Sequence, residues 1–471
     1  MNPKVLFGLL LSAIFFLFIP ACTETTEPIV VILPTATIVI QPATTTPLSA
    51  TKLPTQVAII PDVEKFPDLV EVDFWYPWSG ETAKVVEKLV SDFNLSNTWN
   101  VRIKASQMGD EDFLVGKVIS SLDKEEQPHI ISAPIGFLRN LALAEEVVAD
   151  LSPYVSHARW GISPQEQLLY PVTFWQQDMV GDFRFGLPAQ RNAYFLFYNK
   201  TWAQELGFVS PPSTPDEFLN QSCAAARSNS FDKEPDNDGT GGWIFDSTPA
   251  TVLSWMRVFE GGQMPASESG AYLLQTSANE RAFGFLQQLM RLGCAWTPLE
   301  QNPHLYLKER KALFYSGSME DMIRQEKISI KDDWEMIPYP SLEGNEVILS
   351  DGLSYGILRS DANHDLASWL FIRWLQAPEN LARVIALTST LPPVSSVREE
   401  VNKIAKLNPA WELSLQFLPL VKSMPLLGSW LDAGKVLQDA AWQVVQSNMK
   451  TGDVNTILAD AEILIKEVLN R

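Results

Sequence analysis

Histidine and cysteine are scarce in this chain, which has four of the first and three of the second among its 471 residues. The histidines are scattered at positions 129, 157, 304 and 364, and no two have the spacing of metal ligands. The sequence also lacks a G-x-S-x-G elbow, a Walker loop and a G-x-G-x-x-G turn after a strand. We therefore expect no catalytic centre, no metal and no cofactor, and we predict that the chain is not an enzyme.

Positive charge is also in short supply, with 36 Lys and Arg against 56 Asp and Glu and a net charge of −20. Such a chain is a poor partner for nucleic acid or for anionic membrane surfaces. Carboxylates cluster at 110–112 and 145–146, as a glycosidase would need, but solvated helix ends explain them more simply. Residues 232–239 resemble half a calcium loop, yet Phe245 stands where the bidentate acid should be, which favours a tight Asx-rich turn.

No apolar run is long enough to cross a bilayer comfortably, since the N-terminal run 5–19 has only 15 residues. Lys4 precedes this run, and the following sequence Ile19-Pro20-Ala21-Cys22 resembles the lipobox of bacterial lipoproteins, with Pro20 as a departure from it. We predict a signal peptide at 1–22 and lipidation of Cys22. The alternative is an ordinary signal peptide, in which Cys22 has no role.

The segment after Cys22 is typical of a tether. Residues 23–62 hold ten Thr and six Pro with only four charged side chains, a composition that cannot bury a core. The two remaining cysteines, Cys223 and Cys294, form an even pair in an exported chain, which favours a disulfide. Two buried free thiols are the alternative.

Residues 63–471 are more than usually fold around a single hydrophobic core, so two lobes are expected. Strand and helix patterns alternate in the first part, with strands at 72–76, 101–105 and 129–132 and helices at 81–94, 111–122 and 135–146. This alternation predicts a doubly wound α/β sheet. Further strands are expected at 191–198, 311–315 and 348–358, and helices dominate from 362 onward.

Five segments carry a resemblance to a known family. They are FWYPWSGE at 74–81, LPAQRN at 187–192 followed by YNK at 198–200, KALFYSGS at 311–318, SDGLS at 350–354 and WLFIRWLQAPEN at 369–380. Together they resemble the extracellular solute-binding proteins of ABC importers, of the maltose-binding and glycerol-phosphate-binding type. The last segment is the most specific of the five.

The resemblance implies a two-lobed, periplasmic-binding-protein-like fold of type II, in which each lobe is a doubly wound sheet flanked by helices and crossing hinge strands join the lobes. It places residues 63–192 and 318–377 in the N-terminal lobe, and 193–317 and 378–471 in the C-terminal lobe. A small solute, expected to be a sugar, would bind between the lobes of a monomer. The protein would be extracytoplasmic, lipid-anchored to the cell membrane, and would pass the solute to an ABC transporter permease.

Carried over by position, the resemblance implies ligand contacts at several places. The helix start at 78–81 would offer free N–H groups to ligand oxygens, and the crossovers near 192, 317 and 352 would offer polar side chains. Because sugars have apolar faces edged by hydroxyls, aromatic platforms are also expected. The predicted contacts are Trp78, Ser79, Glu81, Asp110, Arg191, Asn192, Trp243, Trp255, Ser316, Ser318, Asp351, Gly352 and Ser354.

The ligand and the class of function stay open at this point. Asp351 and Leu353 stand where the family has glycines, which leaves the ligand's identity undecided. A glycerol-phosphate-like ligand is less attractive, because Arg191 is the one candidate arginine in the cleft and the chain is acidic. An exported glycosidase and a surface adhesin are the alternatives of another class.

Overall fold

The computed structural model describes residues 60–470, except 123, 125, 269, 343, 345, 405–407 and 451. The predicted signal peptide, Cys22 and nearly all of the predicted tether lie outside the described residues. Within the described ranges, no helix combines the length and the apolar character needed to cross a membrane.

The first part of the chain alternates strands and helices as predicted. Its strands are β1 (Val70–Tyr76), β2 (Val101–Gln107) and β3 (Ile130–Pro134), and its helices are α1 (Gly80–Ser96), α2 (Glu111–Leu122) and α3 (Ile135–Leu143). β1 lies between β2 and β3 and is parallel to both. Helix α3 ends three residues before its predicted end at 146, and Glu146 has a φ of 54°, a left-handed conformation that cannot continue a helix.

A segment expected to be irregular connects this part to the next. It contains the short helices α4 (Ser152–Val155), α5 (Pro164–Gln167) and α6 (Val172–Gln177) and the two-residue strands β4 (Met179–Val180) and β5 (Phe183–Arg184).

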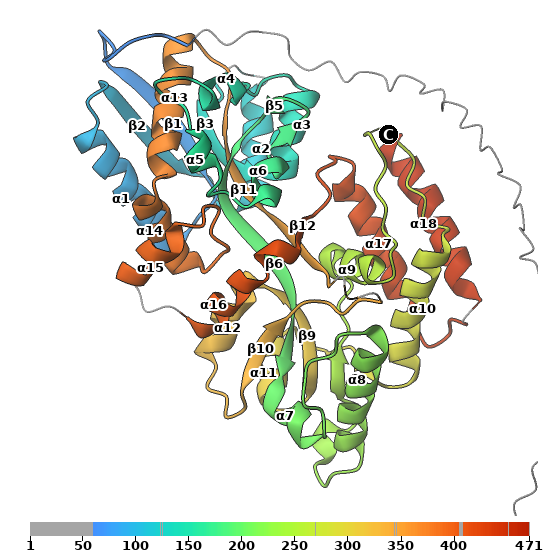
Figure 1. Ribbon diagram of the computed structural model, residues 1–471. Helices are drawn as coiled ribbons and strands as arrows, with labels where there is room; N and C mark the ends of the chain where they lie inside the picture. Colours follow the sequence, from blue (N-terminus) through green and yellow to red (C-terminus); the bar gives the residue numbers. More distant parts are fainter. Residues whose placement is uncertain are drawn as a thin grey trace, which may run out of the picture. The chain divides into compact units, whose positions relative to one another are not determined.

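Strand β6 (Leu187–Asn199) is the longest strand described and links two halves of the sheet. Its first half pairs antiparallel with β11 (Ile348–Ile357), and its second half pairs antiparallel with β9 (Ala312–Ser318) and β10 (Trp334–Ile337). Figure 1 shows β6, in green, passing from the first group of strands to the second. The sheet order is β2-β1-β3-β11-β6-β9-β7-β8, where β7 is Gly241–Ile244 and β8 is Ala295–Trp296. In addition, β10 pairs with β6, and β12 (Val421–Ser423) pairs with β11.

The second half of the sheet carries its own helices. They are α7 (Lys200–Glu205), α8 (Pro215–Ser230), α9 (Pro249–Val258), α10 (Ser277–Arg291), α11 (Pro303–Lys308) and α12 (Met319–Lys327), with strands β7 (Gly241–Ile244) and β8 (Ala295–Trp296). A disulfide joins Cys223 in α8 to Cys294, the residue before β8. In the loop before β7, Asp232 accepts hydrogen bonds from the backbone N–H of Glu234 and the side chain of Asn237, which makes an Asx turn.

Helices fill the C-terminal part, as expected from the sequence. They are α13 (Ala362–Leu375), α14 (Pro378–Thr388), α15 (Val397–Ile404), α16 (Pro409–Gln416), α17 (Trp430–Val444) and α18 (Asp453–Leu469), and the short strand β12 (Val421–Ser423) interrupts them. Helix α14 contacts α1, whereas α17 contacts α9 and α18. The predicted lobe boundaries stay a prediction.

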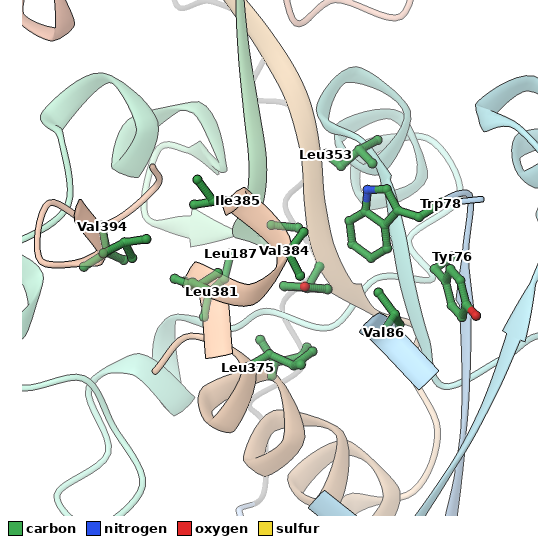
Figure 2. Close-up of a cluster of buried hydrophobic side chains, with 14 of the residues drawn as sticks. Tyr76, Trp78, Val86, Leu187, Leu353, Leu375, Leu381, Val384, Ile385 and Val394 are labelled. Carbon is green, nitrogen blue, oxygen red and sulfur yellow. The ribbon is translucent and has the colours of Figure 1, made fainter. Parts of the chain in front are cut away.

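The hydrophobic core of the first half includes Trp78. Its ring lies near Leu353, Val86 and Tyr76 (Figure 2), and its Nε1–H donates to Oε1 of Gln190 at 2.6 Å. Only 7 % of Trp78 is exposed. The indole is therefore part of the core in this structure.

Candidate functional site

A cavity of about 690 Å³ opens beside the crossing strands. Its walls come from β6, β9, β11, the segment between β7 and α9, and helices α9, α11, α12 and α17. Among its lining residues are Tyr194, Asp246, Thr248, Thr251, His304, Tyr315, Ser316, Gly317, Ser318, Asp321, Arg324, Asp351, Trp430 and Lys435. A cavity of this size matches the usual range for small-molecule sites.

Three of the predicted contacts line this cavity: Ser316, Ser318 and Asp351. Ser318 is the N-cap of α12, and its hydroxyl accepts a hydrogen bond from the N–H of Glu320 at 3.3 Å. Asp351, on β11, accepts a hydrogen bond from the hydroxyl of Tyr194 at 2.6 Å. The pKa of Asp351 is raised, because burial outweighs the hydrogen bond from Tyr194.

Gly352 lies where two strands approach each other closely. Its φ is +144°, and a Cβ built on it would lie 2.2 Å from the carbonyl oxygen of Gln190 on β6. No side chain fits between the two strands at this point. The glycine therefore permits the close approach of β11 to β6, which positions Asp351.

Arg191 and Ser354 lie in the interior, and both were predicted to touch the ligand. Arg191 is fully buried and forms an ion pair with Asp178 at 3.0 Å. Its guanidinium also donates to the carbonyl oxygens of Gln190 and Leu353 and to the hydroxyl of Ser354. Ser354 in turn donates to Asp178 at 2.6 Å. These polar groups bind one another, so a ligand contact does not fit their placement.

The two predicted platforms in the second half are also in the core. Trp243 and Trp255 are 0 % exposed, and their rings meet edge to face at 5.7 Å. Neither indole offers a free face, so a stacking role does not fit this placement either. Trp243 instead supports the cavity wall, because its Nε1–H donates to the hydroxyl of Ser316 at 3.3 Å.

The remaining predicted contacts lie outside the residues that line the cavity. Ser79 is the N-cap of α1, and Glu81 is exposed and paired with Lys84. Asp110 accepts a hydrogen bond from the N–H of Phe113 at 2.9 Å. The side chain of Asn192 accepts hydrogen bonds from the N–H groups of Ala193 and Met319 and so joins β6 to the start of α12.

The start of α2 lies within electrostatic range of the cavity. Burial raises the pKa of Glu111 to about 7, and the charges of Asp351 and Glu320 add to the shift. Glu320 belongs to the first turn of α12. Sequence reasoning named Asp110 here and missed its neighbour Glu111.

Sequence reasoning also missed several residues of the cavity wall. Asp246 lies just before the N-terminus of α9 and accepts hydrogen bonds from Thr248 and Thr251. Burial raises its pKa. His304 Nδ1 lies 3.0 Å from the Tyr315 hydroxyl, and burial lowers the pKa of this histidine. Trp430, Arg324 and Lys435 complete the set. The D-S-T-P sequence at 246–249 is a recognisable helix start, but nothing local distinguishes Trp430 from other helical tryptophans.

Within the described residues, no group of three or more His, Cys, Asp or Glu side chains is arranged to hold a metal ion.

Comparison with known proteins gave one family and many structural neighbours. A family model for bacterial extracellular solute-binding proteins matches residues 88–412. A search of curated proteins found no significant match. The sugar-binding protein MalE from Xanthomonas citri is 20 % identical, with a TM-score of 0.72 over 85 % of this chain and 98 % of its own.

Two further solved structures are similar over most of the chain. The cyclic alpha-maltosyl-1,6-maltose binding protein from Arthrobacter globiformis is 16 % identical, with a TM-score of 0.70 over 84 % of this chain and 99 % of its own. UgpB from Mycobacterium tuberculosis, solved with glycerophosphocholine, is 17 % identical, with a TM-score of 0.68 over 85 % of this chain and 99 % of its own. The predicted two-lobed α/β fold is confirmed by these neighbours.

Proposed function

We propose that this chain, which belongs to the family of bacterial extracellular solute-binding proteins, captures a carbohydrate in its cavity and delivers it to an ABC importer. The family match covers well over half of the chain and implies an extracytoplasmic location. Two of the similar structures are described as binding sugars or sugar oligomers.

The observation that carries the proposal is the chemistry of the cavity wall. Trp430 and the half-buried Tyr194 supply aromatic surface, while Asp246, Asp351 and Ser316 supply hydrogen-bonding groups. A sugar needs both, because its C–H faces pack on aromatic rings and its hydroxyls require polar partners. The volume of about 690 Å³ admits an oligosaccharide as well as a single ring.

Isothermal titration calorimetry against a panel of mono- and oligosaccharides tests the proposal. We expect Trp430→Ala to weaken binding of the best sugar by about 1–3 kcal/mol, because an aromatic anchor is lost. Trp99→Ala is a matched control, since Trp99 is a half-buried tryptophan that packs on Phe93 away from the cavity. The absence of heat with every sugar, at protein concentrations that detect millimolar affinity, would contradict carbohydrate binding.

Ligand-driven closure of two lobes is part of the proposal. The shared strand β6 supports a division into 63–192 with 318–377, and 193–317 with 378–471. Helix α14 contacts α1, which favours moving residues 378–404 to the first lobe. Solution scattering should show a smaller radius of gyration when the ligand is added, whereas a surface adhesin would show no change.

The membrane anchor is proposed from sequence alone. A lipid on Cys22 would hold the protein at the membrane, and residues 23–62 would give it reach toward a permease as a monomer. Cys22→Ser should release the protein from the membrane fraction without changing its ligand affinity. Retention of the variant in that fraction would remove the anchor and leave the binding proposal standing.

A glycerol-phosphate ligand and a glycosidase activity have less support than sugar binding. Glycerol phosphate needs free cations, but Arg324 lies 3.4 Å from Asp321, and the side chains of Arg324 and Lys435 are largely exposed to solvent. A glycosidase would release reducing sugar from a polysaccharide panel, and we expect none.

A further inference from the structure

We propose that the solute carries a positively charged amino group that binds at Asp351, so that the ligand is an amino sugar or an oligosaccharide containing one. This inference rests on the proposed function as a carbohydrate-binding protein and specifies the substrate class of the same cavity.

Asp351 carries a partly desolvated carboxylate that a ligand in the cavity can reach. It is half-buried on β11 and lines the cavity. Among the described residues, the hydroxyl of Tyr194 is its one side-chain hydrogen-bond donor, at 2.6 Å. In the same part of the chain, no Lys, Arg or His forms an ion pair with it. The nearby Arg191 pairs with Asp178 at 3.0 Å and acts on Asp351 only through its charge. A ligand can therefore supply the direct counter-charge that Asp351 lacks.

Two further carboxylates, both exposed and both outside the cavity lining, act on Tyr194 through their charges. Glu320 begins the α12 helix and Glu111 begins α2, so the two approach from different elements. Their charges, together with that of Asp351, act on the Tyr194 hydroxyl, and the pKa of Tyr194 is raised first by burial and then by these charges. The Glu111 side chain still reaches solvent, yet its pKa is raised to about 7 by desolvation and by Asp351 and Glu320.

The cations of the cavity lie at its rim. Side-chain exposure is 64 % for Arg324 and 74 % for Lys435. Arg324 lies 3.4 Å from Asp321, and Lys435 lies 4.0 Å from Asp432. Burial lowers the pKa of His304, which favours its neutral form. Among the described residues, Asp246 and Asp351 therefore line the cavity without an ion pair, whereas its cations are exposed at the outer edge.

A neutral sugar and an amino sugar would meet this wall differently. Hydroxyl groups can donate hydrogen bonds to a carboxylate, but they bring no counter-charge to Asp351. Excluding water from a carboxylate that lacks a counter-charge is costly. An ammonium group supplies the counter-charge and three donors at once. The wall thus favours the cationic ligand.

The test compares sugars that differ only in the amino group. Calorimetry at pH 6.5 would use disaccharides of glucosamine and of galactosamine, each with its N-acetylated and its plain hydroxyl counterpart. We expect at least one amine-bearing disaccharide to bind about tenfold more tightly than both counterparts, with the preference shrinking as salt is added. Asp351→Asn should reduce this preference, measured as the ratio of the two affinities in the same variant, to about twofold or less.

Two further variants serve as a second test and as a control. Glu320→Gln removes an exposed charge that acts on Asp351 from outside the cavity lining, and it should lower the preference even if Asp351→Asn fails to fold. Asp236→Asn removes an exposed carboxylate of the Asx-rich loop and should leave the preference unchanged. Equal or tighter binding of the plain sugars would overturn the inference and leave carbohydrate binding standing. No binding in either series would overturn both.

Discussion

Two groups of polar side chains at the strands β6 and β11 differ in how completely they are paired. In one group, Arg191, Asp178 and Ser354 are wholly buried and bound to one another. In the other, Tyr194 and Asp351 share a single hydrogen bond and face a cavity. The two groups lie only three residues apart on each strand.

The difference separates a structural role from a binding role. A buried charge that is paired with a buried counter-charge is closed off from a ligand, even though Nε of Arg191 has no hydrogen-bond partner, and its removal leaves the counter-charge unpaired in the interior. A half-paired carboxylate at a cavity has capacity left, and solvent supports it when no ligand is bound. Both groups look alike in sequence, as polar residues within apolar strands, so the pairing decides the role.

The largest expected effect follows from breaking the fully paired group. Arg191→Met should lower the free energy of unfolding by about 3–5 kcal/mol, because the Asp178 carboxylate would stay buried without its partner. Urea unfolding followed by circular dichroism measures the loss.

Arg373→Met is the control for that experiment. Arg373 pairs with Glu166 at 2.8 Å, but the side chains are 24 % and 44 % exposed, so its removal should cost about 0–1 kcal/mol. If Arg191→Met lowered the free energy of unfolding by no more than Arg373→Met does, the buried ion pair would not have the structural role that we assign to it.

Removal of the disulfide should give the next largest effect. The double variant Cys223→Ser/Cys294→Ser opens a link between residues 71 positions apart, which should lower the free energy of unfolding by about 2–4 kcal/mol. Since neither cysteine lines the cavity, ligand affinity measured by calorimetry should change little. A large loss of affinity with unchanged stability would mean that the disulfide supports ligand binding rather than the stability of the fold.

A smaller effect is expected from the half-paired group. Tyr194→Phe removes the hydroxyl that orients Asp351, which should weaken ligand binding by about 1–1.5 kcal/mol. The free energy of unfolding should change by less than about 1 kcal/mol, because the cavity lets water reach the carboxylate. Calorimetry and urea unfolding on the same samples separate the two quantities. A stability loss as large as that of Arg191→Met would mean that the two groups do not differ.

The smallest effect concerns Glu111 and depends on pH. Its pKa rises from 4.5 to about 7 in the folded protein, so the folded state holds the proton more tightly than the unfolded state does. Stability from this group is therefore present below pH about 4.5 and is lost as the pH rises through 7. Glu111→Gln should raise the free energy of unfolding by about 0.5–1 kcal/mol at pH 8, an amount reduced by solvent screening, and by nothing at pH 4.5. Thermal melts at the two pH values measure this, and equal shifts at both would contradict the assignment.

Much of the fold could be predicted because its signals are local. The alternation of β1, α1 and β2 follows from apolar spacing that burial reproduces along each element. The irregular connection before β6 was harder, since its helices have only four to six residues. Asp178, the partner of Arg191, ends the last of these helices, so nothing in the local sequence indicated the buried pair.

The site was predictable only in part because it is assembled from distant segments. Ser316, Ser318 and Asp351 follow from motifs at the crossing strands, and all three line the cavity. Trp243 and Trp255 could not be separated from surface tryptophans, because an apolar run does not say which face of the sheet or helix is covered. Trp430 comes from a helix far along the chain, and only the tertiary fold brings it to the cavity.

The position of Trp430 has a consequence for how ligand capture can be observed. Its indole is 7 % exposed and forms part of the cavity wall, whereas Trp243, Trp255 and Trp369 are sealed in the interior. Indole emission responds to the polarity of its surroundings, so one fluorophore of the native chain faces the space that a solute would fill. Ligand binding should therefore change the emission of Trp430, whereas Trp243, Trp255 and Trp369 should contribute a constant signal. Trp442, which is 45 % exposed and lies outside the cavity lining, adds a separate solvent-exposed signal.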